Sequence, residues 1–300
     1  MVSSIQGNGG SVPYFPGLAV VTTIEQRKGR GLALQPSPVK RAAQDLGLEV
    51  LEPENPNTPE FVAALKALNP DLIVLAAYGF ILKPELLAVP KKGCLNLHPS
   101  LLPRYRGAAP IQRAIMAGET ETGVSVFLMN EKIDQGDVIM QNGVMIGLNE
   151  TSGELTLRLA ELAATMLPQA LALVAQGVCP RIVQDPSQAC YARKIAKEER
   201  LISWNRPARE LHNLVRGLSP APSAFTFFRS RRLEILGTES FEARTGIPGE
   251  LVVEGRNLYC GTGMGSLLLT RVKPEAGKLM SGADLINGRR IRSGEKLGEP

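Results

Sequence analysis

The sequence has few residues that bind metals or form disulfides. It contains four cysteines (Cys94, Cys179, Cys190 and Cys260) and two histidines in 300 residues. No two cysteines form a Cys-x-x-Cys pair, and no cluster of histidine, cysteine and carboxylate residues has the spacing of a zinc site. Scattered cysteines are typical of proteins from reducing compartments. We therefore expect no metal site and no disulfide framework.

Long hydrophobic runs are also scarce. A membrane-spanning helix needs about 20 consecutive apolar residues, and no stretch is expected to reach that length. The first residues lack the basic and apolar pattern of an export signal. These features predict a cytoplasmic protein without a membrane partner, and we expect it to be a monomer.

Several common catalytic motifs are missing. The chain has no Gly-x-Ser-x-Gly, which argues against a hydrolase with a nucleophile elbow. It has neither a Walker loop nor a Gly-x-Gly-x-x-Gly segment that follows a strand. The run Gly261–Gly265 precedes a predicted strand rather than a helix, so it is interpreted as a hairpin turn.

The composition fits a globular protein of two domains with unequal charge. Apolar residues make up 44% of the chain and charged residues 21%, which allows a buried core. Residues 201–300 hold 15 of the 34 basic and 10 of the 29 acidic residues, a net charge of +5, so the rest of the chain is neutral. A basic module beside a neutral one is typical of a catalytic domain with a polyanion-binding appendage. Ordinary surface lysine and arginine would give the same count.

The chain alternates predicted strands and helices up to about residue 180. This alternation predicts an α/β domain with a largely parallel sheet. A capping box, Thr151–Glu154, opens a long apolar helix in which Pro168 is expected to cause a kink. The predicted strands are Leu18–Thr23, Glu49–Leu51, Asp71–Ala77, Cys94–His98, Gly123–Met129 and Val138–Ile146. The other predicted helices are Val39–Leu46, Thr58–Leu68 and Ala108–Ala117.

The pattern changes after that point. One amphipathic helix, Pro207–Leu218, is followed by five short predicted strands between Phe225 and Val272, separated by Gly-rich turns. This order is typical of a small β-barrel of the oligonucleotide-binding type. We expect a catalytic domain over residues 1–184, a linker over 185–204 and a C-terminal barrel over 205–300.

The strongest candidate for a catalytic site is the end of the predicted strand Cys94–His98. Side chains two residues apart in a strand point to the same face, so Asn96 and His98 lie side by side. Pro99 stops the strand, which places both near its carboxyl end, where open α/β sheets bind ligands. An amide donor beside an imidazole suits a reaction that develops charge on a carbonyl oxygen. A lone buried histidine is more often a satisfied core residue. The only other histidine, His212, is expected on a surface helix.

A second candidate segment is the polar loop Asn130–Asp137, which follows another apolar strand. A carboxylate in this loop would orient the imidazole and raise its basicity. Asp134 and Asp137 are equal candidates from the sequence, and a solvated turn is the plain alternative.

These residues carry a resemblance to a known family. The run Gly93–Gly107, with its core Asn-Leu-His-Pro-Ser-Leu-Leu-Pro, strongly resembles the folate-dependent formyltransferase superfamily. The resemblance covers Leu18 to about Asn287 and implies a Rossmann-like formyltransferase domain followed by the barrel. Four more segments narrow it to the methionyl-tRNA formyltransferases: Pro36–Lys40, Ala77–Phe80, Gly107–Gln112 and Thr122–Ser125.

The resemblance implies a reaction and the residues that carry it. Asn96, His98 and Asp134 match the catalytic trio of the family. The methionyl amine of initiator tRNA would attack the formyl carbon of 10-formyltetrahydrofolate. Asn96 and a protonated His98 would stabilise the oxyanion, and Asp134 would hold the imidazole and assist proton transfer. No covalent enzyme intermediate and no metal are implied.

The resemblance also implies binding residues. The stretch Tyr78, Gly79, Phe80, Ile81 and Leu82 matches one segment that shapes the folate pocket. Another matching segment consists of Ser100, Leu101, Leu102 and Pro103. Arg27, Lys28 and Arg30 match a loop that contacts the acceptor end of tRNA. Five arginines of the barrel would supply a further surface that binds tRNA phosphates: Arg229, Arg231, Arg232, Arg289 and Arg290.

The sequence departs from the family pattern at its start. The family opens with a strand, a Gly-Thr-Pro turn and a helix before the strand that matches Leu18–Thr23, but only 17 residues precede Leu18 here. A parallel crossover alone needs a dozen or more residues. We therefore expect the first strand–helix unit to be missing, strand edges to be exposed, and stability and activity to be low.

Three other functions would account for part of this pattern. A formyltransferase for a small amine, such as glycinamide ribonucleotide, would share the trio but would not need a basic barrel. A sugar-nucleotide formyltransferase would also leave the charge after residue 200 unexplained. A catalytically impaired RNA- or folate-binding remnant would explain the missing strand but not the retained trio.

Overall fold

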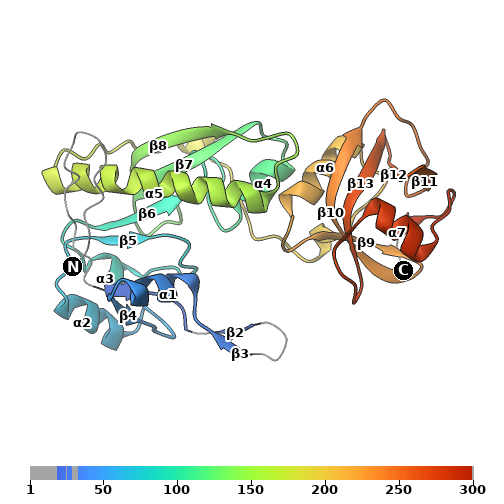
Figure 1. The fold of residues 1–300 in the computed structure, drawn as a ribbon. Coiled ribbons are helices and arrows are strands. Elements are labelled where there is room, and N and C mark those ends of the chain that lie inside the picture. The colour runs from blue at the N-terminus through green and yellow to red at the C-terminus, as the bar shows by residue number, and fades with distance from the viewer. Residues whose placement is uncertain (1–18, 25, 29–32, 299–300) are drawn as a thin grey trace, which may run out of the picture. The chain divides into compact units, whose positions relative to one another are not determined.

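The structure, a computed structural model, describes residues 19–24, 26–28 and 33–298 (Figure 1). Contacts between residues divide the chain into two compact units. One contains the described residues up to His98 together with 125–141 and 163–186, and the other contains 99–124, 142–162 and the rest of the chain from Ser187. Three elements run from one unit into the other: β7 (Glu121–Leu128), β8 (Val138–Met145) and α5 (Ser152–Gln176).

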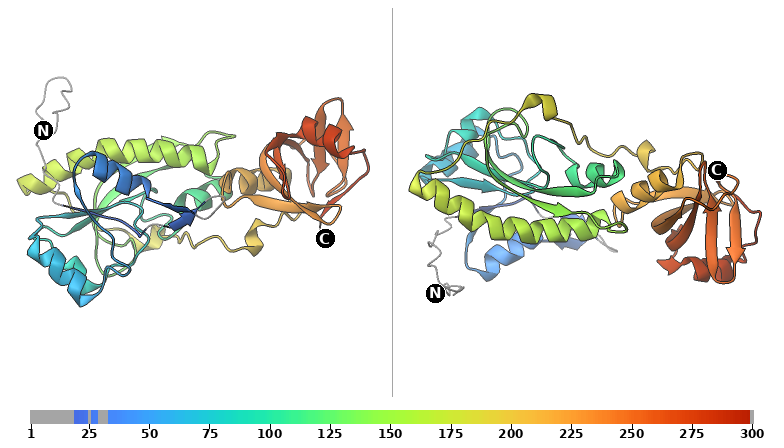
Figure 2. Two further views of the ribbon diagram at one scale, coloured as in Figure 1. Left: turned by 60° about the horizontal axis from the view of Figure 1, so that its bottom comes forward. Right: turned by 90° about the horizontal axis from the view of Figure 1, so that it is seen from above.

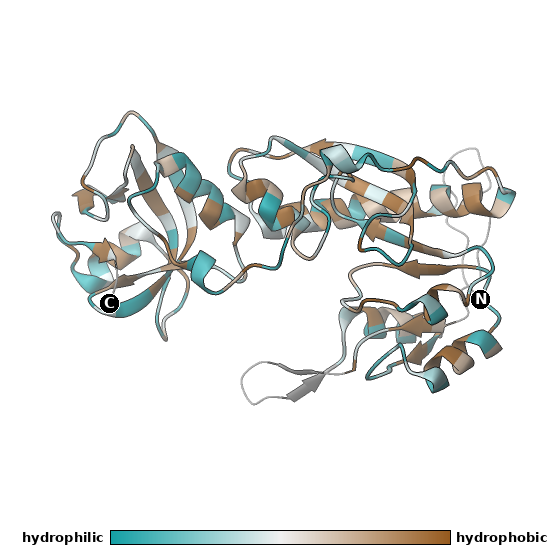
Figure 3. Ribbon diagram, turned by 180° about the vertical axis from the view of Figure 1, so that it is seen from behind, coloured by the Kyte–Doolittle hydropathy of each residue, from teal (hydrophilic) through white to brown (hydrophobic). Residues whose placement is uncertain are grey.

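The strands of the first unit form separate sheets. Strand β1 (Ala19–Val21) pairs in parallel with β4 (Glu49–Leu51). Strand β5 (Ile73–Leu75), brown in Figure 3, pairs in parallel with β6 (Cys94–His98). Strand β6 is antiparallel to β7, and the four-stranded order is β5-β6-β7-β8. Strands β2 (Gln26–Lys28) and β3 (Ala33–Gln35) form an antiparallel hairpin.

The short helices before β8 lie close to their predicted positions, except that the helix Pro84–Leu87 was not predicted. Helices α1 (Pro38–Asp45), α2 (Pro59–Ala67), α3 (Pro84–Leu87) and α4 (Pro110–Met116) each have proline at the first helical turn. Proline is favoured there because its missing N–H has no helical partner to lose. The Thr58 hydroxyl accepts a hydrogen bond from the Phe61 N–H and caps α2.

No strand among the described residues joins the two parallel pairs. Among the described residues, β1 pairs only with β4, and β5 pairs only with β6. Val21 and Leu51 nevertheless pack against the core that contains Leu75 and Cys94. The segment 1–18, in which the first strand was expected to be missing, lies outside the described residues.

Helix α5 is a single continuous element that lies beside the sheet β5–β8 (Figures 1 and 2). Its capping box is present, because the Thr151 N–H donates to Glu154 at 2.8 Å and the Glu154 N–H donates back to the Thr151 hydroxyl at 3.3 Å. The helix runs through Pro168 and ends before Gly177, whose φ is +72°. In the first unit, the Lys92 ammonium donates to the carbonyls of Val174 and Ala175 near the end of α5.

The expectation about hydrophobic runs is wrong for α5. By length and composition alone, Ser152–Gln176 is long and apolar enough to cross a membrane. Core helices meet the same criterion. Only part of the surface of α5 is buried, as in a helix that packs one face on a protein core. The buried apolar residues are Leu155, Leu159, Met166, Ala170 and Val174, whereas Leu157 is exposed.

The second unit contains a curled antiparallel sheet. The strand order is β11-β12-β13-β10-β9-β15, with β14 paired to β13. The segments Gly249–Leu251 and Gly294–Leu297 exchange backbone hydrogen bonds of 2.7–2.9 Å and join the two ends of this path. The strands are β9 (Ala224–Phe228), β10 (Arg231–Phe241), β11 (Leu251–Glu254), β12 (Asn257–Gly261), β13 (Ser266–Pro274), β14 (Met280–Ser281) and β15 (Leu297–Gly298).

Helices complete this unit. Two 3₁₀ helices, Pro186–Gln188 and Glu198–Arg200, precede α6 (Ala208–Gly217), and α7 (Gly282–Arg289) follows β14. Leu211, Leu214 and Val215 of α6 are buried in the core of the barrel, as the sequence predicts. The predicted fold class, an α/β domain with a largely parallel sheet followed by a small β-barrel, is confirmed.

The prediction of a surface position for His212 is wrong. His212 on α6 is 3% exposed. Its Nε2 bonds to the Leu148 carbonyl at 3.1 Å, so Nε2 carries the proton, and its Nδ1 lies 2.9 Å from the Thr238 hydroxyl. The Arg216 guanidinium on the same helix donates to the carbonyls of Gly147 and Glu150. The segment Gly147–Glu150 therefore covers the polar side of α6.

Burial of His212 predicts acid sensitivity of the fold. Burial lowers the pKa of this imidazole below its ordinary 6.5, with a further contribution from nearby Arg216. The unfolded chain then binds more protons than the folded chain below about pH 6.5, so the free energy of unfolding falls as pH decreases from there. We expect the melting temperature to drop more steeply between pH 7 and pH 5 for the wild type than for His212→Gln. Parallel melting curves would contradict this prediction.

Candidate active site

The site is built around β6 as the sequence predicts. Asn96 and His98 lie two residues apart on this strand, so their side chains share one face of the sheet. Asn96 faces Phe127 across the antiparallel pair with β7, and His98 faces Ser125. His98 is 4% exposed and is the last residue of the strand. The imidazole is thus buried at the carboxyl end of β6.

The structure distinguishes the two candidate carboxylates. Oδ2 of Asp134 lies 3.6 Å from Nδ1 of His98, and both side chains are largely buried. This distance allows a charge–charge interaction but is longer than a direct hydrogen bond. The carbonyl of Asp137 instead accepts the Leu128 N–H at 2.9 Å and closes the base of the loop. The geometry therefore favours Asp134 as the partner of the imidazole.

The loop that carries Asp134 has an unusual backbone. Asp134 has φ of +53°, a left-handed conformation that non-glycine residues rarely adopt. A Cβ atom on Gly136 would lie 1.6 Å from the Leu128 carbonyl oxygen, so only glycine fits there. A shallow hollow of about 380 Å³ beside the loop is lined by Asn130, Glu131, Lys132 and Gln135.

Sequence reasoning missed two glutamines next to this site. Nε2 of Gln184 donates to the carbonyls of Asp134 and Gly136 at 3.0 and 2.8 Å. Nε2 of Gln141 donates at 2.8 Å to the hydroxyl of Ser125, the residue opposite His98. No sequence motif marks either glutamine, although Ser125 belongs to a segment that carries the family resemblance.

The first expected folate segment, Tyr78–Leu82, is an irregular turn in the first unit. Ala77 and Gly79 have φ of +51° and +82°. The rings of Tyr78 and Phe80 lie 5.4 Å apart, and burial raises the pKa of the Tyr78 hydroxyl. That buried hydroxyl has no hydrogen-bond partner among the described residues. Asn57 braces the turn, because its amide donates to the Ile81 carbonyl at 2.9 Å.

The second expected folate segment, Ser100–Pro103, lies in the second unit. The Ser100 hydroxyl donates to the Arg104 carbonyl at 2.6 Å, and Leu102 is buried. The peptide bond between Leu102 and Pro103 is cis. The Arg104 N–H donates to the Leu101 carbonyl at 3.1 Å, so the segment that directly follows β6 is a tight turn.

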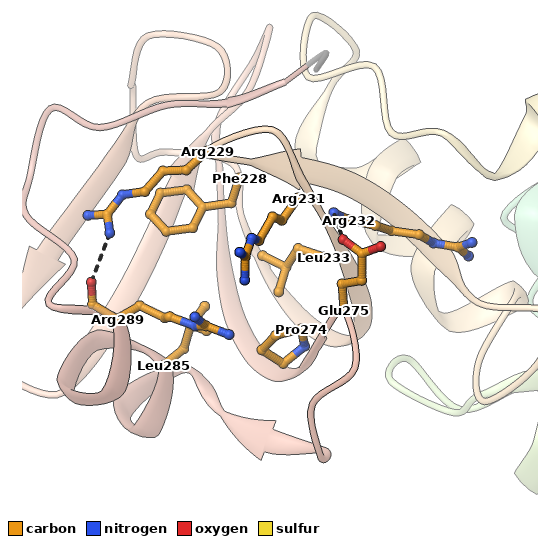
Figure 4. Close-up of a pocket in the computed structure, with 9 residues that line it drawn as sticks. All are labelled: Phe228, Arg229, Arg231, Arg232, Leu233, Pro274, Glu275, Leu285 and Arg289. Carbon is orange, nitrogen blue, oxygen red and sulfur yellow. Dashed lines mark hydrogen bonds between the residues drawn. The ribbon is translucent and has the colours of Figure 1, made fainter. Parts of the chain in front are cut away.

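The expected tRNA-binding residues divide into two groups. Arg30 lies outside the described residues, as do the side chains of Arg27 and Lys28 on β2. On the barrel, a hollow of about 300 Å³ is lined by four arginines, by Glu275 and by apolar residues that include Phe228, Leu233 and Leu285 (Figure 4). The arginines are Arg229, Arg231, Arg232 and Arg289.

The four arginines of this hollow differ in their pairing. Arg229 forms an ion pair with Glu295 at 2.6 Å, and Arg232 lies 3.7 Å from Glu234. Arg231 and Arg289 have no carboxylate partner within the described part of the chain. Arg290, the fifth arginine, ends α7 in a left-handed conformation. The hollow therefore carries excess positive charge.

No group of three or more histidine, cysteine or acidic residues that could hold a metal ion occurs among the described residues. The four cysteines are free thiols. Burial raises the pKa of the Cys94 thiol to about 11, so this thiol stays neutral near pH 7. Cys94 is therefore not an activated nucleophile, although it begins the strand that carries Asn96 and His98.

Comparisons with known proteins identify the family of this chain. Residues 10–171 match the formyl transferase family, and residues 194–290 match the formyl transferase C-terminal domain. The chain is 43% identical to the methionyl-tRNA formyltransferase of Moorella thermoacetica, over 93% of this chain and 91% of that protein. It is also 43% identical to the same enzyme of a Methylobacterium species, over 93% and 91% of the two chains.

Solved structures show the same fold at lower identity. The Helicobacter canadensis N-formyltransferase, in complex with folinic acid and dTDP-3-aminofucose, has a TM-score of 0.63 and 17% identity, and the match covers 79% of this chain and 83% of that one. HypX from Aquifex aeolicus, in complex with tetrahydrofolic acid, has a TM-score of 0.61 and 19% identity over 82% of this chain and 43% of that one. Matching over nearly their full length, the relatives show that this chain belongs to the methionyl-tRNA formyltransferase family of formyl transferases.

Proposed function

We propose that this chain transfers the formyl group of 10-formyltetrahydrofolate to the amino group of methionyl initiator tRNA in the cytoplasm, and so supports translation initiation. The observation that carries the proposal is the arrangement of Asn96, His98 and Asp134. An amide and an imidazole share one face at the end of a buried strand, and a carboxylate lies 3.6 Å from the imidazole. This trio suits an acyl transfer that passes through a negatively charged oxygen.

In this proposal the amine nitrogen bonds to the formyl carbon, and the bond from that carbon to the folate nitrogen then breaks. The Asn96 amide and the imidazolium of His98 donate hydrogen bonds to the formyl oxygen while it carries negative charge. The amine loses one proton and the folate nitrogen gains one, so the overall proton count does not change. Asp134 stabilises the positive charge on His98 and keeps the ring oriented.

The folate supplies the formyl carbon, and we propose that the turn Tyr78–Leu82 binds its pterin ring. Phe80 and Ile81 are exposed apolar side chains at this turn, with 37% and 68% exposure. The unpaired Tyr78 hydroxyl offers a hydrogen bond to a polar ring edge. Such apolar walls with a few polar groups are typical of small-molecule sites. Ser100–Pro103 are proposed as a further folate-binding segment.

The test is formyl transfer by the purified chain. Methionyl initiator tRNA, glycinamide ribonucleotide and a dTDP-amino sugar would each be mixed with 10-formyltetrahydrofolate, and the formylated product would be measured by mass. We expect product with the tRNA alone. Faster formylation of either small amine would overturn the proposed acceptor. Binding of tRNA and folate without any product would mean that the chain is a catalytically impaired RNA- or folate-binding remnant.

The arginine hollow on the barrel is proposed to hold a backbone phosphate of the tRNA. Arg231 and Arg289 supply charge that no described carboxylate neutralises. We expect Arg231→Gln/Arg289→Gln to raise KM for methionyl-tRNA about 10-fold at physiological salt, with kcat and the folate KM unchanged. The slope of log affinity against log salt should decrease by roughly 1 to 2 units.

The control for the hollow is Arg256→Gln, an exposed arginine in the turn between β11 and β12. It removes one positive charge from the same barrel outside the hollow. An equal rise in KM per lost charge in both variants would show that net charge, rather than the hollow, attracts the tRNA.

A further inference from the structure

We propose that Gln184 is a positioning residue for formyl transfer: its side-chain amide holds the Asp134–Gly136 turn so that the carboxylate of Asp134 stays beside His98. The inference rests on the proposed function of that site. Gln184 is 8% exposed, and its Nε2 donates to the carbonyls of Asp134 and Gly136 at 3.0 and 2.8 Å. A primary amide has two N–H donors, which matches the two carbonyls.

The turn needs such an external partner. Asp134 adopts a left-handed backbone with φ of +53°, which is unfavourable for a non-glycine residue. Asp134 lies in a turn, outside the strands and helices. A conformation of this kind persists when surrounding contacts fix it. Gln184 supplies two of these contacts, one at each end of the turn.

Gln184 is itself anchored to the strand that the turn enters. Two residues before it, Ile182 exchanges both backbone hydrogen bonds with Val138, at 2.9 and 3.0 Å. Val138 begins β8 and follows Asp134 by four positions. At the opposite side, the Leu128 N–H donates to the Asp137 carbonyl at 2.9 Å. The base of the loop is thus fixed by backbone pairs, and the Gln184 amide fixes the turn above it.

The orientation of Asp134 depends on this turn. At 3.6 Å from Nδ1 of His98, its carboxylate is close enough to stabilise an imidazolium, and the direction in which it points follows from the backbone conformation of the turn. A change of Asp134 to the right-handed region would turn the carboxylate away from the ring. A misplacement of about 1 Å can cost about 100-fold in rate. Gln184 therefore acts through Asp134, without contact to the reacting atoms.

The first experiment compares Gln184→Met with the wild type. Methionine has similar length and volume but no donor, so it removes both hydrogen bonds. We expect kcat to fall 10- to 100-fold, with KM for methionyl-tRNA and for the folate within 2-fold of wild type. The matched control is Gln176→Met at the exposed end of α5, which should leave both constants unchanged. A rise in either KM without loss of kcat would overturn the proposal.

The second experiment repeats the substitution in an Asp134→Asn background. If Gln184 acts by holding the carboxylate, its loss should cost less than 3-fold once that carboxylate is gone. The same 10- to 100-fold loss in both backgrounds would assign Gln184 a general structural role and overturn the proposal. If Gln184→Met folds poorly, Gln184→Glu replaces the donors with acceptors of the same shape, and the same coupling is expected.

A spectroscopic readout separates this inference from the proposed reaction. The chain has only two histidines, so their ring nitrogens can be assigned with His98→Ala. We expect Gln184→Met to shift the ring ¹⁵N resonances of His98 and to leave those of His212 unchanged. This result is independent of turnover, so a chain without formyl transfer would refute the proposed function alone. Unchanged His98 resonances would refute the role of Gln184.

Discussion

Replacement of His98 by alanine is expected to slow formyl transfer by about 1,000-fold or more, because it removes a charged donor and a proton-transfer group from the site. Asn96→Ala should cost about 100- to 1,000-fold, the typical loss for one oxyanion donor. Single-turnover rates with methionyl-tRNA would measure the chemical step without product release. Both variants should bind the folate with near wild-type affinity, since neither side chain is proposed to bind the pterin.

The second histidine provides a matched control. His212→Gln removes the other imidazole of the chain, which bonds to Leu148 and Thr238. We expect this variant to lose thermal stability but to keep its single-turnover rate at 25 °C. A loss of less than 10-fold in His98→Ala would contradict the assignment of His98, as would an equal loss in His212→Gln.

The trio should also behave as a unit. If Asp134 acts by stabilising the imidazolium of His98, then Asp134→Ala in the His98→Ala background should cost little more than His98→Ala alone. Multiplicative losses would mean that Asp134 contributes to the reaction independently of the imidazole.

The strand at the centre of the site could be predicted because its signal is local. The period of two in Cys94–His98 places Asn96 and His98 on one face, and Pro99 ends the strand. The choice between Asp134 and Asp137 could not be made in this way. It depends on a left-handed backbone at Asp134, which the sequence marks only through the nearby Gly136.

Contacts between segments that are far apart in the chain could not be predicted from the sequence. Gln184 lies about 50 positions from the carbonyls that it binds and belongs to no helix or strand. Helix α6 has an amphipathic sequence pattern, which predicts a surface position for His212. Its polar side is buried because the loop Gly147–Glu150 offers carbonyls to His212 and Arg216. The predicted helix and strand positions were accurate where the hydrophobic period alone determines them.

Substitution of Gly136 by alanine is expected to abolish most activity and to destabilise the fold. The added Cβ would lie 1.6 Å from the Leu128 carbonyl oxygen and 2.8 Å from its carbon, which are backbone atoms of β7. The loop must therefore move away from the strand, and Asp134 moves with it. Overpacking of this kind costs about 1–3 kcal/mol in the free energy of unfolding, and we expect kcat to fall at least 100-fold.

Gly288→Ala is the matched control, because a Cβ at Gly288 in α7 would meet no atom within 4 Å. Alanine favours a helix over glycine, so this variant should gain up to about 1 kcal/mol in stability and keep full activity. Urea denaturation and single-turnover kinetics on both variants would measure the two effects. If Gly136→Ala lost stability but kept the wild-type rate, the position of the Asp134 loop would not matter for the reaction.

Greater loss of rate in Gly136→Ala than in Asp134→Ala would instead mean that the displaced loop also disturbs His98 or Asn96, since removal of the carboxylate alone leaves the backbone in place.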